Sequence, residues 1–151
     1  MPKLEFSFNL PTEPNQLMKL SEDYESIPQY LPDQLKSVKI IEQNGNETKT
    51  EEIIVFSTLL KKEIIQHALH RKNGNNQLTT EIISGPAKGT TLNVTFEKID
   101  SGTKVVFDVD LKLSIKAKFL QPLIKKYYKM VLTSVLYKMN NTILQSQTNG
   151  G

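Results

Sequence analysis

Two histidines are the side chains of this sequence best suited to proton transfer near neutral pH. They are His67 and His70, the only histidines among the 151 residues. They lie three positions apart on a predicted strand, and that spacing directs two side chains to opposite faces of a sheet. We therefore expect no shared metal ion, and we take His67 as the histidine that faces the interior.

Two further polar residues lie within the apolar face of a helix that we predict over 117–144. A tyrosine such as Tyr127 can bury its ring and still offer its hydroxyl group to a ligand. A serine such as Ser134 needs a partner in apolar surroundings, either its own helix backbone or a bound molecule. Tyr30 and Leu31, in a short segment bracketed by prolines, either pack in the core or face a ligand.

Most signatures of catalysis are missing from the sequence. There is no cysteine, which excludes disulfides and thiolate metal ligands. The stretch from Gly85 to Gly89 lies between two predicted strands, whereas a phosphate-binding loop joins a strand to a helix. Asp108 and Asp110 share a strand face with Lys112, so we expect them to be solvated. We predict no catalytic residue, no metal site and no cofactor.

The charge of the chain is mildly basic, with a net charge of +3. Arg71 is its only arginine, although arginine is the usual residue for bidentate contacts to phosphates and bases. We therefore expect no nucleic-acid partner. Four lysines gather on the outer face of the predicted terminal helix: Lys118, Lys125, Lys126 and Lys129. That face is either simply solvated or makes transient contact with an anionic membrane surface, where each charge contributes up to ~1 kcal/mol.

The helix predicted over 117–144 has the longest helical periodicity in the chain. Its apolar face carries Leu120, Leu123, Ile124, Tyr127, Val131, Ser134 and Val135, and an apolar face of this kind must be covered by another element. Before it, apolar residues alternate in seven segments separated by turn signals such as Asn44-Gly45-Asn46. We predict strands over 3–9, 34–43, 49–60, 61–72, 77–84, 90–99 and 103–115. Two short helices, over 13–23 and 26–32, should follow the first strand.

This order of elements, with Asp23-Tyr24-Glu25-Ser26-Ile27-Pro28-Gln29-Tyr30-Leu31-Pro32 after the first helix, resembles the helix-grip superfamily. The segment Phe119-Leu120-Gln121-Pro122-Leu123-Ile124-Lys125-Lys126 resembles the entry to its terminal helix. The superfamily includes START-type lipid-transfer domains, polyketide cyclase/dehydrase-like proteins and coenzyme Q-binding proteins. The resemblance implies an α+β helix-grip fold, in which two short helices follow strand 1. It further implies a seven-stranded curved antiparallel sheet with a long C-terminal helix across it, and a hydrophobic cavity between the two.

We expect one domain over 1–145 and a flexible polar tail over 146–151. The favoured function is binding or transfer of a hydrophobic small molecule, of lipid, isoprenoid or quinone type, without catalysis. One alternative is a cyclase/dehydrase-like enzyme that pairs His67 or His70 with Tyr127. Another is a protein-interaction module that binds a chaperone or ribosomal partner. No apolar run is long enough for a signal peptide or a membrane span, so we expect a cytoplasmic protein. The candidate ligand-binding residues are Tyr30, Leu31, Phe56, His67, Phe107, Tyr127, Val131 and Ser134.

Overall fold

The computed structural model describes residues 3–56 and 62–149. Within these residues, seven antiparallel strands form one sheet in the order β1-β7-β6-β5-β4-β3-β2. The predicted helix-grip fold is thereby confirmed. The strands are β1 (Lys3–Leu10), β2 (Leu35–Asn44), β3 (Glu47–Phe56), β4 (Lys62–Asn73), β5 (Gln77–Ile82), β6 (Thr91–Ile99) and β7 (Gly102–Asp110).

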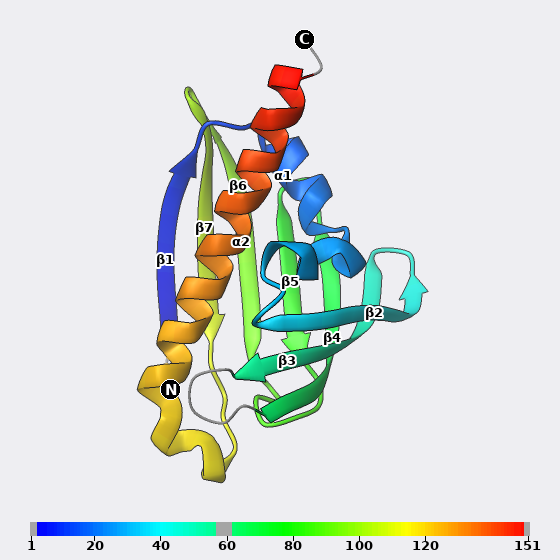
Figure 1. Cartoon of the computed structure of the whole chain (residues 1–151), viewed down its shortest axis with the longest axis vertical. Helices are drawn as coiled ribbons and strands as arrows, with labels where there is room; N and C mark the ends of the chain where they lie inside the picture. The colour runs from blue at the N-terminus through cyan, green and yellow to red at the C-terminus, as the bar shows by residue number, and fades with distance from the viewer. Residues whose placement is uncertain (1–2, 57–61, 150–151) are drawn as a thin grey trace.

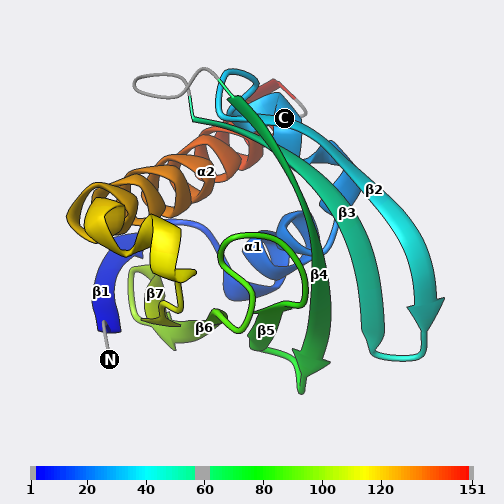
Figure 2. The ribbon, with the colours of Figure 1, turned by 90° about the horizontal axis from the view of Figure 1, so that it is seen from below.

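Short turns explain why strands β2 to β7 follow one another in space as they do along the chain. Gly45 and Gly74 take φ values of 58° and 67° in the turns of the β2–β3 and β4–β5 hairpins, a region that glycine adopts without a steric penalty. Strand β1 pairs with β7, with Leu10 opposite Thr103. The long strands curve, and Figures 1 and 2 show that β2, β3 and β4 bend toward the side of the sheet that carries the helices.

All helices of the described chain lie on the concave side of the sheet (Figure 2). The α-helix α1 (Pro14–Ser21) and the 3-10 helix η1 (Tyr24–Tyr30) follow β1, as predicted from the sequence. A second 3-10 helix, η2 (Ile115–Leu120), leads into the long helix α2 (Gln121–Asn149), which crosses the sheet diagonally (Figure 1). None of the described helices is long and apolar enough to cross a bilayer.

The ends of two elements differ from the prediction. Strand β7 ends at Asp110, so Ile115, expected to point inward, lies in η2 with 86% of its surface exposed. Helix α2 begins at Gln121 rather than at residue 117, which places Pro122 in the first turn. A proline is tolerated there because backbone N–H groups of the first turn make no hydrogen bond within the helix. It continues to Asn149 and so includes most of the polar tail predicted over 146–151, because no glycine or proline follows Pro122 before Gly150.

Helix α2 is anchored by its second half. The buried residues there are Val135, Leu136, Met139, Asn140 and Ile143, whereas in the first half only Ile124 is buried. The hydroxyl group of Thr12 donates to the Asn140 side chain at 3.0 Å, and the Lys138 ammonium group donates to the Tyr30 carbonyl at 2.7 Å. The first half of α2 therefore stands over the sheet without a continuous packed core beneath it.

Candidate functional site

A cavity of about 1040 Å³ occupies the space between α2 and the concave face of the sheet. Most residues on its wall are aliphatic or aromatic. The sheet contributes Ile54, Ile82, Val94 and Phe107, among others, and the helix contributes Leu123, Ile124, Val131, Val135 and Leu136. Ligand pockets in proteins typically measure about 300–1,000 Å³ and combine apolar walls with a few polar groups. This cavity lies at the upper end of that range.

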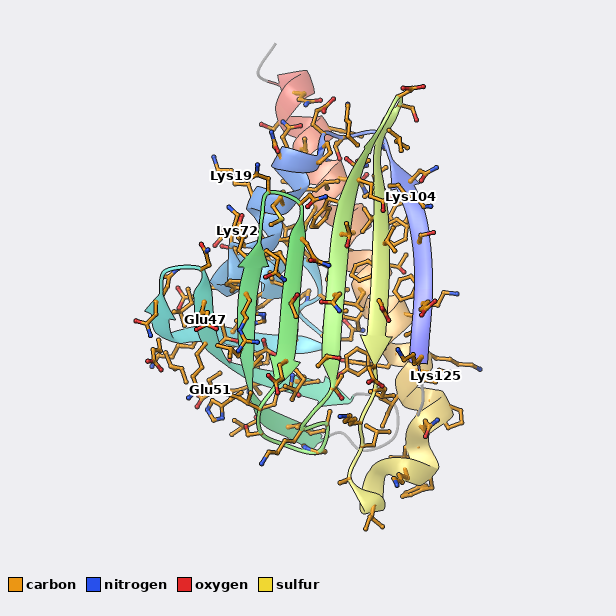
Figure 3. The ribbon with its side chains drawn as sticks, turned by 180° about the vertical axis from the view of Figure 1, so that it is seen from behind. Lys19, Glu47, Glu51, Lys72, Lys104 and Lys125 are labelled. Carbon is orange, nitrogen blue, oxygen red and sulfur yellow. The ribbon has the colours of Figure 1, made fainter. Side chains whose placement is uncertain are left out.

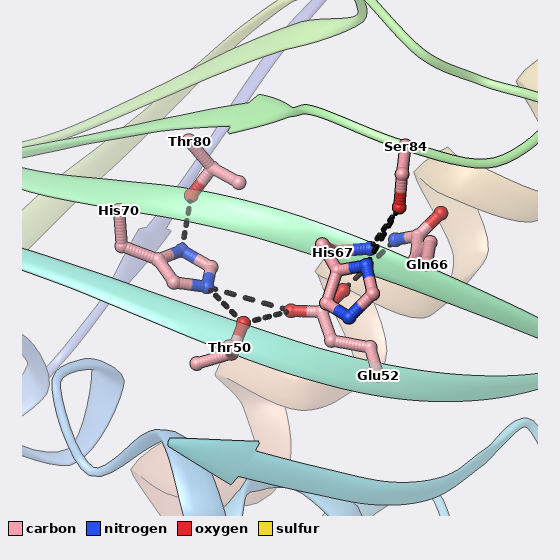
Figure 4. Close-up of polar contacts among 7 residues, drawn as sticks. All are labelled: Thr50, Glu52, Gln66, His67, His70, Thr80 and Ser84. Atoms are coloured by element: carbon pink, nitrogen blue, oxygen red, sulfur yellow. Dashed lines mark hydrogen bonds and ion pairs between the residues drawn. The ribbon is translucent and has the colours of Figure 1, made fainter. Parts of the chain in front are cut away.

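A group of polar side chains interrupts the apolar wall on β3, β4 and β5 (Figure 4). Glu52 lies directly opposite Gln66 in the β3–β4 pair, and the Gln66 amide donates to Glu52 Oε1 at 2.8 Å. The Thr50 hydroxyl group donates to Glu52 Oε2 at 3.0 Å. Because strand side chains alternate between faces, even-numbered residues of both strands point into the cavity. We call Thr50, Glu52, Gln66 and His70 the polar cluster.

His70 completes this cluster and fixes the direction of its hydrogen bonds. Its Nε2 lies 2.9 Å from the Thr50 hydroxyl oxygen and 3.4 Å from Glu52 Oε2. Since Thr50 gives its single hydroxyl hydrogen to Glu52, Nε2 must be the donor to Thr50. Nδ1 lies 2.7 Å from the hydroxyl oxygen of Thr80 on β5. The Tyr24 ring stacks on the imidazole with centroids 4.2 Å apart, so the imidazole is held both at its nitrogens and on its face.

Glu52 is held as a carboxylate inside the cavity. Burial by itself raises the pKa of this carboxyl group. Hydrogen bonds from His70, Gln66 and Thr50, together with the charge of His70, act in the opposite direction, and the net effect lowers the pKa below its ordinary value. The side chain keeps 14% of its surface accessible, and Glu52 belongs to the cavity wall. An anionic acceptor is therefore open to a bound molecule.

Two tyrosines of α2 line the opposite wall. The Tyr127 hydroxyl group donates to the Gln34 carbonyl at 3.2 Å, and burial raises its pKa to about 12. Tyr128 is also on the wall, and burial together with the nearby charge of Glu52 raises its pKa above the ordinary value. Within the described part of the chain, the hydroxyl group of Tyr128 makes no hydrogen bond. Tyr128 is thus available, across the cavity from Glu52, as a hydrogen-bond donor.

Three of the predicted site residues, Phe107, Tyr127 and Val131, lie on the cavity wall. Tyr30 and Leu31 do not, because they are buried in the hydrophobic core between η1 and α2. Ser134 is partly buried but lies outside the wall; at its level of α2, the wall is formed by the adjacent Val135 and Leu136. The side chain of Phe56 lies outside the described residues.

The choice of His67 is corrected by the structure. His67 lies on the outer face of β4, where Nδ1 is 2.8 Å from Ser84 Oγ and Nε2 is 3.2 Å from Glu51. Glu51 points away from α2 (Figure 3). The two histidines do face opposite sides of the sheet, as their spacing predicted, but the inward one is His70. Among the described residues, no group of three or more histidine, aspartate and glutamate side chains could hold a metal ion.

The polar cluster is not predicted from the sequence, because the apolar residues of β3 and β4 dominate the pattern of these strands. Thr50 and Glu52 share a strand face with Ile54, and Gln66 and His70 share one with Ala68. The signal that could reveal the cluster is the presence of polar residues at every second position of a strand, on the same face as its buried apolar residues.

Exposed apolar and basic side chains surround one end of the cavity. Phe119 is 78% exposed and Leu123 is 37% exposed, yet both also belong to the cavity wall, as does Lys126. Lys118 lies beside them in η2, and Lys125, labelled in Figure 3, lies near the start of α2. Lys129 stands over the Phe6 ring at 5.9 Å from its centroid. We take this end of the cavity, at η2 and the start of α2, as its entrance, because exposed wall residues gather there.

Comparison with known proteins agrees with this architecture. Residues 10–142 match the sequence model of the family described as "Polyketide cyclase / dehydrase and lipid transport". No curated protein sequence matches the chain significantly.

Several solved structures share the fold at low sequence identity. The protein TTHA0849 from Thermus thermophilus superposes with a TM-score of 0.80 at 19% identity, covering 96% of this chain and 99% of that one. The Zhui aromatase/cyclase from Streptomyces sp. R1128 gives 0.76 at 9% identity, covering 94% and 95%. A START superfamily protein from Mycobacterium smegmatis gives 0.72 at 15% identity, covering 95% and 97%. At these identities the likeness establishes the fold and not the activity.

Proposed function

The chain belongs to the polyketide cyclase / dehydrase and lipid transport family, and from this premise we propose that it binds a hydrophobic small molecule between the sheet and α2. The observation that carries the proposal is the cavity of about 1040 Å³ with apolar walls and one polar cluster. A lipid or an isoprenoid alcohol has the corresponding division into a long apolar body and a small polar end. A cavity of this size favours ligand binding over the protein-interaction alternative.

The energetics of burial relate the affinity of a ligand to the apolar area that it buries. Apolar surface contributes about 25 cal/mol per Å² when it leaves water. A ligand that buries about 500 Å² therefore gains roughly 12 kcal/mol, of which at least about 4 kcal/mol is lost with its freedom of motion. The remaining ~8 kcal/mol corresponds to a dissociation constant of about 1 μM. We therefore expect a ligand of lipid size rather than a small fragment.

The side chains at the entrance favour a function in which the ligand passes between the cavity and a membrane surface. Phe119 and Leu123 offer apolar side chains there, while Lys118, Lys125, Lys126 and Lys129 offer positive charge. Exposed apolar groups with neighbouring lysines favour contact with anionic lipid headgroups. In this proposal, the protein touches such a surface with η2 and the start of α2 while its ligand enters or leaves.

Binding of the neutral fluorescent probe N-phenyl-1-naphthylamine tests the cavity. The unmodified protein should enhance probe fluorescence with a micromolar dissociation constant. Val131→Trp places a large ring on the cavity wall and should weaken binding at least tenfold. Lys104→Trp adds the same ring on the outer face (Figure 3) and should leave binding unchanged. Equal binding by all three proteins, or no binding by any, would refute the proposal.

A second candidate function, an acid–base enzyme, is favoured by Glu52 and Tyr128. A carboxylate on one wall can accept a proton from carbon next to a carbonyl group, while a tyrosine on the other wall donates a hydrogen bond to the carbonyl oxygen. The predicted pairing of His67 or His70 with Tyr127 is not the basis of this candidate, because His67 lies outside the cavity and the Tyr127 hydroxyl group donates to the Gln34 carbonyl. Incubation of the protein with 2-tetralone in D₂O should then accelerate deuterium incorporation at its acidic carbon. Glu52→Gln should abolish that acceleration, and no acceleration by the unmodified protein would exclude this chemistry for the probe.

A further inference from the structure

The polar end of the cavity has a definite electrostatic character. Glu52 is its central group, and His70 Nε2 lies 3.4 Å from the Glu52 carboxylate, a contact that is an ion pair only when the imidazole is protonated. The other groups around it are hydroxyl and amide groups of Thr50, Thr80 and Gln66. No lysine or arginine side chain of the described chain pairs with Glu52, so its negative charge is not cancelled by a permanent positive one.

The remaining charged residues of the wall are distant from this end or already paired. Glu63, at the start of β4, forms an ion pair with Lys36 of β2. Lys126 is exposed at the entrance. Glu22, which does not belong to the wall, lies near Tyr24 and is paired with Lys72 at 3.4 Å. Nothing among these groups offers a cation to a ligand placed beside the polar cluster.

The carboxylate also has unused capacity to accept hydrogen bonds. Its two oxygens provide about four lone-pair positions. Gln66 donates to Oε1, and Thr50 donates to Oε2, which His70 also approaches. Because Glu52 lies on the cavity wall with part of its surface accessible, a ligand hydrogen-bond donor can fill the remaining position on Oε1.

Tyr128 supplies the complementary group from α2. Its hydroxyl group is unengaged within the described residues, and the charge of Glu52 acts on it. A ligand whose polar end both donates and accepts hydrogen bonds can use the Glu52 carboxylate and the Tyr128 hydroxyl group as its partners. A ligand carboxylate would instead place a second negative charge beside Glu52 in surroundings of low polarity, where like charges repel strongly.

We infer that the cavity selects amphiphiles whose polar end donates a hydrogen bond or carries a positive charge, such as alcohols, phenols and amines, and discriminates against carboxylates. This inference rests on the proposed function and specifies its ligand. Among quinone-type ligands, it favours the reduced quinol, which has hydroxyl donors, over the quinone, which has only acceptors.

A matched set of ligands with one apolar chain tests this selectivity. Dodecan-1-ol, dodecylamine, dodecanoate and 1-methoxydodecane compete for the protein against N-phenyl-1-naphthylamine at pH 7.5. The alcohol and the amine should displace the probe at concentrations at least tenfold lower than dodecanoate. The methyl ether, which cannot donate, should fall between them. Equal displacement by the alcohol and dodecanoate would overturn the inference, and this comparison needs no variant.

Two variants assign the selectivity to one side chain. Glu52→Gln keeps the shape but removes the charge, and it should reduce the preference for the alcohol over dodecanoate to less than threefold. Glu51→Gln removes the neighbouring carboxylate of β3, which points away from α2 (Figure 3), and should leave the preference unchanged. An unaltered preference in Glu52→Gln would overturn the inference. Failure of the probe and of all four ligands to bind the unmodified protein would instead refute the proposed function itself.

Discussion

Glu52 and Gln66 lie directly opposite each other on β3 and β4, and the Gln66 amide donates to Glu52 Oε1 at 2.8 Å. This pair sets the chemical character of the cavity. Burial raises the pKa of the carboxyl group, but its donors outweigh that effect, and the pKa of Glu52 lies below its ordinary value in a largely apolar wall. The molecule therefore places polar groups at two inward positions of its sheet that packing alone would fill with aliphatic side chains.

Gln66→Leu should destabilise the protein at neutral pH by about 1–3 kcal/mol, because a buried acceptor loses its donor. The pKa of Glu52 is lowered in the folded state, so its stabilising contribution exists above the ordinary value of 4.5 and disappears as the pH falls. The variant's deficit should accordingly shrink when urea unfolding is repeated at pH 4. Gln43→Leu, on an exposed position of β2, should change stability by less than about 0.5 kcal/mol. A deficit that stays constant with pH would contradict this account of Glu52.

Tyr127→Phe should alter the response of the protein to alkaline pH. Burial raises the pKa of Tyr127 to about 12 in the folded state. A raised pKa stabilises the fold fully below the ordinary value of 10, and that stabilisation is lost as the pH rises through 12. The variant should therefore lose less stability between pH 10 and pH 12 than the unmodified protein. Absorbance at 295 nm should also show one fewer phenolate forming near pH 12; an unchanged titration would contradict the assignment.

Gly102→Ala should be among the most damaging single substitutions in the sheet. Gly102 begins β7 with a φ of 144°, and an added Cβ would lie 2.1 Å from the Leu10 carbonyl oxygen of β1. The strand pair would have to separate there, at an expected loss of about 3 kcal/mol or more in urea unfolding. Gly45→Ala, at a φ of 58° with open space around it, should lose only about 1–2 kcal/mol. Equal losses in the two variants would show that the β1–β7 contact is looser than described.

Replacing Lys118 and Lys126 together by glutamine should weaken binding to vesicles that contain 30% phosphatidylserine. Two charges at up to ~1 kcal/mol each predict a loss of about tenfold, and at most about thirtyfold, measured by vesicle sedimentation. The double variant Lys19→Gln, Lys104→Gln removes the same charge away from the entrance (Figure 3) and should bind as the unmodified protein does. A similar loss in both double variants would indicate general attraction between a basic protein and an anionic surface.

The fold could be predicted from the sequence because its strands alternate clearly and its turns are marked. The alternation through Val105, Phe107 and Val109 identified the inner face of β7 correctly, and all three are buried. The end of that strand was harder, because Leu111 and Leu113 continue the alternation although the strand stops at Asp110. Periodicity indicates which side chains lie on the same face of a strand, but it does not indicate where the backbone hydrogen bonds to the next strand end.

The site was less predictable for a related reason. In β4, Ile64 and Ile65 are both apolar, so the sequence alone does not decide whether the even or the odd residues face inward. The sequence therefore does not distinguish His67 from His70 as the inward histidine. The outcome depends on pairing with β3, where Thr50 lies opposite Ala68 and Glu52 lies opposite Gln66. Residues far apart in the chain jointly define the polar cluster. The sequence of one strand does not specify which residues of the neighbouring strand lie opposite it.

The most direct test of the account is the location of a bound amphiphile. Intermolecular nuclear Overhauser effects between dodecan-1-ol and methyl-labelled protein would place the alkyl chain against individual side chains. The account predicts contacts to Ile54, Val94 and Val131, which line the cavity. Contacts confined to surface methyl groups, such as those of the exposed Ile41 or of Val106 on the outer face of β7, would contradict it.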